Sequence, residues 1–201
     1  MIPDILESNL NLVIVSTALT QESDGLGFFH LGTKDRIWYL LEYGGITPTP
    51  IFTPPERKVL VNAKKGNVLN DMYKQLYFEK KQSASLKRRM GMMLLNRRRL
   101  AKDDEDPDAM PIEKDIKQFV SKVTKFKPRV LAFITQVEVF EKCFKPLYPS
   151  ANRTRGRQDF SIGSSEVWLV GNTLGKTKDL EELESIFEEI AKRIEPTAAG
   201  A

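Results

Sequence analysis

The apolar run at residues 12–15 and the small polar residues after it constrain the fold of this chain most strongly. Residues 12–15 read LVIV, a continuous and mostly β-branched run that is typical of a strand buried on both faces. Residues 16–20 read STALT, so the strand is predicted to open into a loop there. The loop beyond a buried strand is where α/β proteins bind planar ligands, and residues 16–30 are therefore the first candidates for a site.

Two glycines and three flat rings lie within this loop. Gly25 and Gly27 allow the backbone to turn tightly or to approach a ligand closely. Phe28, Phe29 and His30 follow them, in a place that most folds keep polar. We predict that these rings contribute to a pocket. Packing in the core is the alternative for the two phenylalanines, and a loop position without a role is the alternative for the histidine.

The rest of the chain alternates between predicted strands and predicted helices. Further strands are expected at 129–134 and 166–170, and helices at about 33–43, 56–61, 112–125, 137–144 and 180–194. This alternation predicts an α/β fold with a mostly parallel sheet and helices on both faces. We expect one domain over residues 1–201, with an insertion at about 79–110 that has a basic amphipathic middle at 86–100 and an acidic end at 103–108.

The positive charge of the chain is concentrated in one segment. Residues 74–100 contain nine Lys or Arg and one Glu, a local net charge of +8, whereas the whole chain carries +4. The remaining residues are therefore net acidic. Clustered cations are what binding to a phosphate backbone requires. A solvated loop and a localisation signal are the alternatives.

The cysteine and histidine counts exclude several kinds of site. Cys143 is the single cysteine and His30 the single histidine, so neither an intrachain disulfide nor a zinc site built from these residues is expected. No apolar run approaches the ~20 residues that span a membrane, and no signal-peptide pattern is present. We expect a soluble intracellular monomer without metal or cofactor, nuclear in a eukaryote and cytoplasmic in a prokaryote.

Several short motifs in register resemble one known family. They are the N-terminal IPDIL at residues 2–6, the strand at 10–15, the G-x-G-aromatic stretch at 25–30 and Arg36-x-Trp38. In this order and spacing they resemble the mismatch-specific uracil/thymine DNA glycosylases of the uracil-DNA glycosylase superfamily, over residues 2–72 and 112–194. The resemblance implies a three-layer α/β/α fold with a short, mostly parallel sheet.

The resemblance also implies an activity and a partner. Members of this family hydrolyse the bond that joins uracil, or thymine or another damaged base, to deoxyribose in mismatched double-stranded DNA, as a step of base excision repair. The base must first be flipped out of the stack, because its reacting atoms are shielded in the duplex. Such an enzyme needs no metal and no cofactor.

The residue that activates water departs from the best-known family motif. Many members carry G-I-N-P-G after the first strand, and Ala18 stands where its Asn would be. A second branch has G-T-A-A-G there and an Asp in a later G-L-T-D motif. Thr17 and Ala18 match that branch, and residues 68–71 (VLND) resemble its second motif, which makes Asp71 the candidate catalytic carboxylate. A helix cap is the alternative role for Asp71.

The resemblance assigns further residues to the base and to the DNA. His30 falls at the stacking position, and the base-pocket residues are Thr17, Ala18, Phe28, Phe29, His30 and Asn172. Residues 172–178 match the loop that enters the duplex, although Lys176 stands where the family has an apolar wedge, which Leu174 could replace. An ordinary turn before a helix is the alternative for this loop. The expected DNA contacts are Lys176, Thr177, Lys178, Lys87, Arg88, Arg89, Arg97, Arg98 and Arg99.

A non-enzymatic function is the second hypothesis that the sequence leaves open. Ser16 and Thr20 replace glycines of the family motif, and their side chains could crowd a bound base. A catalytically inactive relative would keep the fold as a nucleic-acid-binding or assembly module. The position of Asp71 relative to Thr17 and Ala18 would distinguish the two hypotheses.

Overall fold

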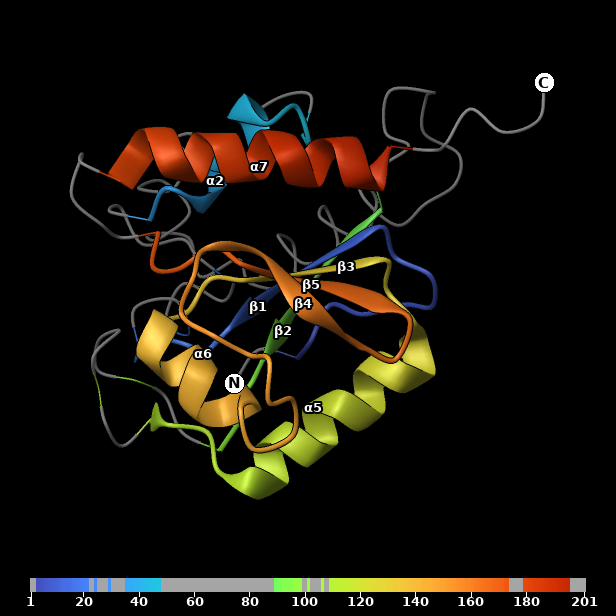
Figure 1. Cartoon of the computed structure of the whole chain (residues 1–201), viewed down its shortest axis with the longest axis vertical. Helices are drawn as coiled ribbons and strands as arrows, with labels where there is room; N and C mark the ends of the chain where they lie inside the picture. Colours follow the sequence, from blue (N-terminus) through green and yellow to red (C-terminus); the bar gives the residue numbers. More distant parts are fainter. Residues whose placement is uncertain are drawn as a thin grey trace.

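A five-stranded sheet forms the centre of the computed structural model (Figure 1), which describes residues 3–21, 24, 29, 35–47, 89–98, 101, 106, 109–173 and 179–195. Its strands are β1 (Leu12–Ser16), β2 (Met90–Leu94), β3 (Val130–Phe133), β4 (Gly156–Ile162) and β5 (Ser165–Leu169). They lie in the order β2-β1-β3-β5-β4. All neighbouring strands pair in parallel except β4 and β5, which are antiparallel.

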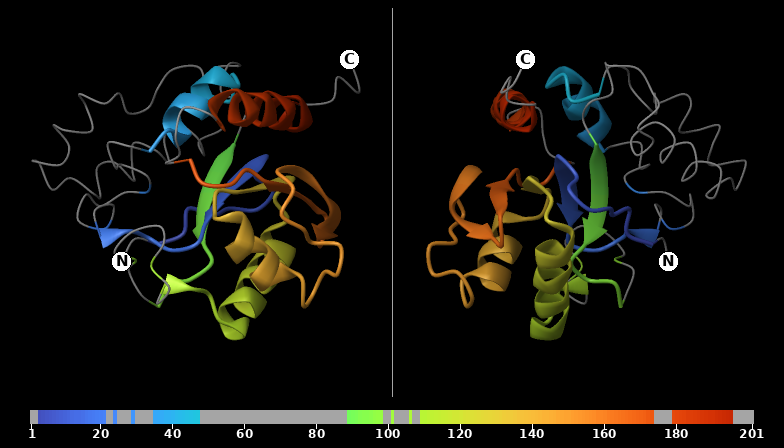
Figure 2. Two further views of the ribbon diagram at one scale, coloured as in Figure 1. Left: turned by 60° about the vertical axis from the view of Figure 1, so that its left-hand side comes forward. Right: turned by 90° about the vertical axis from the view of Figure 1, so that its right-hand side faces the viewer.

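Helices cover both faces of this sheet. The described helices are α2 (Ile37–Tyr43), α5 (Glu113–Phe126), α6 (Val137–Phe144) and α7 (Leu180–Ile194). Figure 2 shows α2 and α7 together on one face and α5 and α6 on the other. The described residues thus form a mixed α/β structure with a mostly parallel sheet, as the alternation of strands and helices predicted, and the arrangement is compatible with three layers.

The alternation of side chains along β1 separates the core into two clusters. Leu12 and Ile14 point to the face covered by α2 and α7, whereas Val13 and Val15 point to the face covered by α5 and α6. On the second face, Phe133 lies at the centre of an aromatic cluster. Its ring meets the rings of Phe140 and Phe144 edge to face, with centroids 5.1 and 5.0 Å away. These two buried clusters hold the sheet rigid between its helices.

Strand β2 differs from the sequence prediction. Residues 86–100 were predicted to be an amphipathic part of an insertion, but Met90–Leu94 are all buried and pair in parallel with β1 along its whole length. Part of the segment 79–110 therefore belongs to the central sheet. The run of Met, Gly and Leu is short and lies between arginines, so its pattern, which is apolar on both faces, was not recognised as a strand.

The N-terminal segment covers the outer edge of β2. The backbone of Ile5 exchanges two hydrogen bonds of 2.9 Å with Met92. A side chain at position 91 would collide with the carbonyl oxygen of Ile5, so Gly91 permits this close crossing. The edge of the parallel sheet is thereby closed to further pairing along part of its length.

The other boundaries agree with the sequence except at β4. The observed strands β1, β3 and β5 and the helices α5, α6 and α7 lie within one or two residues of their predicted ranges, whereas α2 begins at Ile37 rather than near residue 33. Strand β4 was missed, since no strand is predicted between residues 144 and 166. The helix expected at 56–61 lies outside the described residues.

Candidate functional site

The carboxyl ends of four parallel strands meet at one edge of the sheet, and the candidate site lies there. The chain leaves β1 toward β2 on one side, and it leaves β3 toward β4 and β5 on the other. The point between β1 and β3 is therefore a topological switch point, where open α/β sheets form their ligand-binding crevice. The residues at this point are polar rather than apolar.

A pair of threonines bridges the switch point. Thr17 directly follows β1 and Thr135 lies just beyond β3, and their hydroxyl groups are hydrogen-bonded to each other. Thr135 is buried, with 2 % of its surface exposed, whereas Thr17 is half-buried. The hydroxyl pair fixes the loop after β1 against the neighbouring strand and leaves Thr17 and Ala18 partly accessible at the edge.

The loop after β5 starts at the same edge. The N–H of Gly171, with φ of +91°, donates a hydrogen bond of 3.2 Å to the carbonyl of Phe133 at the end of β3. Asn172 follows and is half-buried. The structure thus brings Thr17, Ala18 and Asn172 to one edge of the sheet, with β3 between their loops. Their sequence separation gives no hint of this proximity.

A buried aspartate links this loop to the start of α2. One carboxylate oxygen of Asp35 accepts hydrogen bonds from the hydroxyl of Thr173 (2.9 Å) and from the N–H of Ile37 (3.0 Å). Both Asp35 and Thr173 are buried, 8 % and 3 % exposed. This bond places Arg36 and the first turn of α2 beside the loop after β5. Sequence reasoning missed Asp35, Thr173 and Thr135, although each stands where a strand has just ended or a helix is about to begin.

Asn96 completes the edge at the end of β2. Its backbone N–H donates to the carbonyl of Thr17 (2.7 Å), its side-chain amide donates to the carbonyl of Ala109 (2.8 Å), and its side-chain oxygen accepts from the N–H of Arg98 (2.8 Å). The residue is fully buried. Its side chain therefore joins the residues directly after β2 to the backbone at Ala109.

Several residues of the predicted site lie outside the described part of the chain. They are Asp71, Phe28, His30, Lys176, Thr177, Lys178, Lys87, Arg88 and Arg99. Their roles stay predictions. Phe29 is described, and it belongs to the core between the sheet and helices α2 and α7, with 1 % of its surface exposed. Of the two roles open to Phe29, core packing is the one seen.

The described arginines of the basic segment are all held in ion pairs. A guanidinium nitrogen of Arg97 lies 2.9 Å from Asp4, and Arg89 pairs with Glu7. Arg98 contacts both carboxylate oxygens of Asp115 at 2.9–3.0 Å. These pairs tie the N-terminal segment and α5 to the chain around β2. The side chain of Arg98 is nevertheless 48 % exposed, so its outer face is open to solvent.

Arg98 governs the ionisation of Asp115. Burial alone would raise the pKa of this carboxyl group, but hydrogen bonds from the Arg98 guanidinium and the Ile112 N–H outweigh burial and lower the pKa below its usual value. Asp115 is therefore ionised near neutral pH. It anchors the first turn of α5 to the loop after β2.

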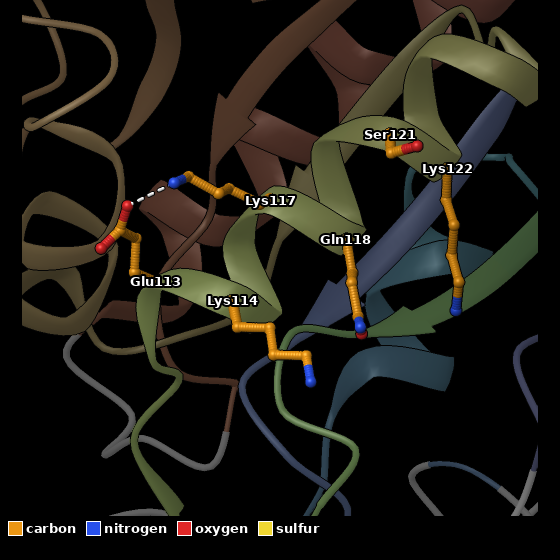
Figure 3. A pocket seen from close by; sticks show the side chains of 6 residues that line it. All are labelled: Glu113, Lys114, Lys117, Gln118, Ser121 and Lys122. Carbon is orange, nitrogen blue, oxygen red and sulfur yellow. Dashed lines mark ion pairs between the residues drawn. The ribbon is translucent and has the colours of Figure 1, made fainter.

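An open groove on α5 carries further positive charge (Figure 3). It is lined by Glu113, Lys114, Lys117, Gln118, Ser121 and Lys122. Lys117 pairs with Glu113 at 2.5 Å and Lys122 with Asp4 at 2.6 Å, whereas Lys114 makes no ion pair within the described residues. The basic surface was predicted only at residues 74–100, because the lysines of α5 are spread along an amphipathic pattern and form no run in the sequence.

The described residues were also searched for metal sites and for helices that could span a membrane. Among them, no group of three or more His, Cys, Asp or Glu is placed to hold a metal ion. Similarly, no helix in that part of the chain is both long and apolar enough to cross a membrane.

Comparison of the chain with models of known protein families gives no match, and comparison with curated proteins gives none either.

Proposed function

We propose that the chain is a DNA glycosylase that hydrolyses the N-glycosidic bond of uracil, or of a related base, in mismatched DNA. The observation that carries this proposal is the meeting of Thr17, Ala18 and Asn172 at the switch point of the sheet. Two motifs of the glycosylase resemblance, far apart in the sequence, supply these three residues. The same edge of an α/β sheet is where a ligand is expected on general grounds.

The reaction makes specific demands on this edge. A flipped base needs polar groups that bind its carbonyl and N–H groups, and the loops after β1 and β5 contain the half-buried polar residues Thr17 and Asn172. Water must attack the anomeric carbon of the sugar while the bond to the base breaks and the base leaves with the bonding electrons. In this proposal Asp71 accepts the proton of water and stabilises the cationic sugar, and His30 stacks on the base.

Positive charge close to this edge supports binding of the DNA backbone. Arg98 follows β2 and its side chain is about half exposed. It pairs with Asp115 in the first turn of α5, and the lysine-lined groove runs along that helix from there. A duplex bound at the edge of the sheet could therefore continue along α5 with its phosphates near Lys114 and Lys117.

A second candidate is a nucleic-acid-binding module without catalytic activity. It is favoured by the state of the buried polar residues Asn96 and Asp35, whose side chains already bind neighbouring groups of the protein. Among the described residues of this edge, neither is available to activate water. The enzymatic proposal therefore depends on Asp71.

Incubation of purified protein with a duplex that contains one uracil opposite guanine tests the proposal directly. Excision leaves an abasic site, which hot alkali converts into a strand break. We expect breaks at the uracil position and none in the matched duplex with cytosine. Tight binding to both duplexes without a break would contradict the enzyme and support the binding module.

A further inference from the structure

We propose that the outer surface of α2 and α7 binds an arginine-rich segment of a partner protein. This surface, here called the acidic tyrosine face, consists of Tyr39, Tyr43 and the surrounding glutamates Glu42, Glu184 and Glu188. Helices α2 and α7, which carry this face, lie on the opposite side of the sheet from α5 (Figure 1). The inference goes beyond the proposed glycosylase activity and does not depend on it.

Two exposed aromatic rings form the centre of this face. Tyr39 and Tyr43 are 46 % and 47 % exposed, although each is a large and mostly apolar side chain. They lie one helical turn apart, with ring centroids separated by 6.0 Å. Pairs of exposed tyrosines are typical of protein interfaces, where the ring supplies contact area and the hydroxyl a polar contact.

Negative charge surrounds the two rings. The Tyr39 hydroxyl donates a hydrogen bond of 2.6 Å to Glu184, and this bond raises the pKa of Tyr39. Glu184 and then Glu188 raise the pKa of Tyr43 through their charge. Residues 37–43 and 180–195 together contain seven glutamates against Lys192 and Arg193, a net charge of −5.

The helices present this face on a rigid support. The opposite side of α2 is buried, with Trp38, Leu40 and Leu41 in the core. At its end, a side chain at Gly44 would come within 2.9 Å of the carbonyl oxygen of Phe187, so α2 and α7 are in close backbone contact. A rigid surface loses little conformational entropy when a partner binds.

Flat rings next to carboxylates match one kind of partner best. A guanidinium group stacks on an aromatic ring and can also donate two parallel hydrogen bonds to a carboxylate. The ammonium group of lysine lacks the planar fork. Nucleic acid is disfavoured here, because its phosphates would meet the glutamates. An arginine-rich segment therefore fits the acidic tyrosine face better than a lysine-rich segment or DNA.

Fluorescence anisotropy with the full-length chain tests the proposal, with labelled nona-arginine and nona-lysine peptides as probes. We expect nona-arginine to bind at least about threefold more tightly, the scale of a cation–π contact at an exposed ring. Tyr43→Ala should remove that preference and Tyr43→Phe should keep it. Glu188→Gln should weaken both peptides, whereas the charge-matched control Asp159→Asn, at an exposed position on β4, should leave both within about twofold of the parent.

Three results would overturn the proposal. The first is equal affinity for the two peptides, and the second is unchanged binding by Tyr43→Ala. The third is concentration-dependent dimerisation of the parent chain in sedimentation, lost in Tyr43→Ala, since the occupant would then be a second copy of this chain. Both tyrosines are largely exposed, and circular dichroism spectra of the variants check that they fold.

Discussion

The hydroxyl pair of Thr17 and Thr135 is the residue-scale feature on which the candidate site depends. It joins the loops after β1 and β3, and one partner is buried while the other is half-exposed. A hydrogen bond at such a place stabilises the fold only modestly, but it determines where Thr17 and Ala18 lie at the edge of the sheet.

Replacement of Thr135 by Val should therefore affect the site more than the fold. The loss of one hydrogen bond should lower the free energy of unfolding by about 1 kcal/mol, measured by urea denaturation. Excision and binding of a uracil duplex should fall under solution conditions in which the variant is fully folded. Thr135→Ser keeps the hydroxyl and serves as the control. Equal binding by Thr135→Val and the parent would show that the pair does not shape the site.

Asp71 carries the residue-scale prediction for catalysis. Asp71→Asn removes the group that accepts the proton of water, so excision should fall by about two orders of magnitude or more. Binding to the uracil duplex should persist, as gel-shift titration would show. Asp35→Asn serves as the comparison for loss of a carboxylate with a structural role, because Asp35 is buried at the same edge and bonds to Thr173. Full excision by Asp71→Asn would refute the assignment.

Strand β2 and its neighbours show how a short apolar run becomes a strand of the sheet. Met90–Leu94 pairs with β1 on one side, and its other edge is crossed by the N-terminal segment at Ile5. That crossing requires a position without a side chain, and Gly91 provides it. The integrity of β2 thus depends on contacts far away in the sequence.

Gly91→Ala is predicted to destabilise the protein. The added methyl group meets the backbone of Ile5 as well as the side chain of Leu10, so the segment at Ile5 must move, at a cost of about 1–3 kcal/mol. Thermal or urea unfolding would measure this loss. Met93→Leu, a swap of similar volume in the same strand, should cost less. If both variants unfold like the parent, the N-terminal segment does not hold the edge of β2 in solution.

The ion pair between Arg98 and Asp115 links β2 to α5 and should make stability depend on pH. The pKa of Asp115 is lowered in the folded state, so its contribution to stability is present above the pKa of an unfolded aspartate, about 4. It is lost as the pH falls through the lower pKa of the folded state. The stability difference between the parent and Asp115→Asn should thus be constant near neutral pH and shrink in acid. A difference that is unchanged between pH 6 and pH 2.5 would contradict this account.

Among the described residues, charge is divided between the two faces of the sheet. Lysines line the groove on α5, on one face of the sheet, and glutamates surround the tyrosines of α2 and α7 on the other. A polyanion and a cationic protein segment could therefore bind at the same time on opposite sides. The modest net charge of +4 conceals this separation.

The salt dependence of DNA binding should reveal which cations contact phosphates. Each contact adds about 0.9 to the slope of log affinity against log salt on duplex DNA. Lys114→Ala combined with Lys117→Ala should reduce the slope by up to about 1.8 for every sequence alike. Lys142→Ala, an exposed position on α6, is the control. An unchanged slope in the double variant would exclude the α5 groove from the interface. Variants of Arg97 and Arg98 are less suitable, since they also remove ion pairs to Asp4 and Asp115.

The sequence by itself determined the fold class and most of its elements. Continuous apolar runs predicted β1 and β3, and the amphipathic spacing of residues 180–194 predicted α7, because these patterns follow directly from burial on two faces or on one. It also indicated that residues 17 and 18, after β1, and residue 172, after β5, could bind a ligand.

Strand β2 and the composition of the candidate site were decided only by the tertiary structure. Five residues of Met, Gly and Leu between arginines carry too little pattern to identify β2, and its identity comes from pairing with β1. The strand order alone brings the loops after β1, β3 and β5 together, and it selects Thr135, Asp35 and Thr173 as members of the edge. Hydrogen bonds between residues far apart in sequence leave no local signature. Sequence periodicity therefore predicts elements, whereas the composition of the site follows from how those elements pack.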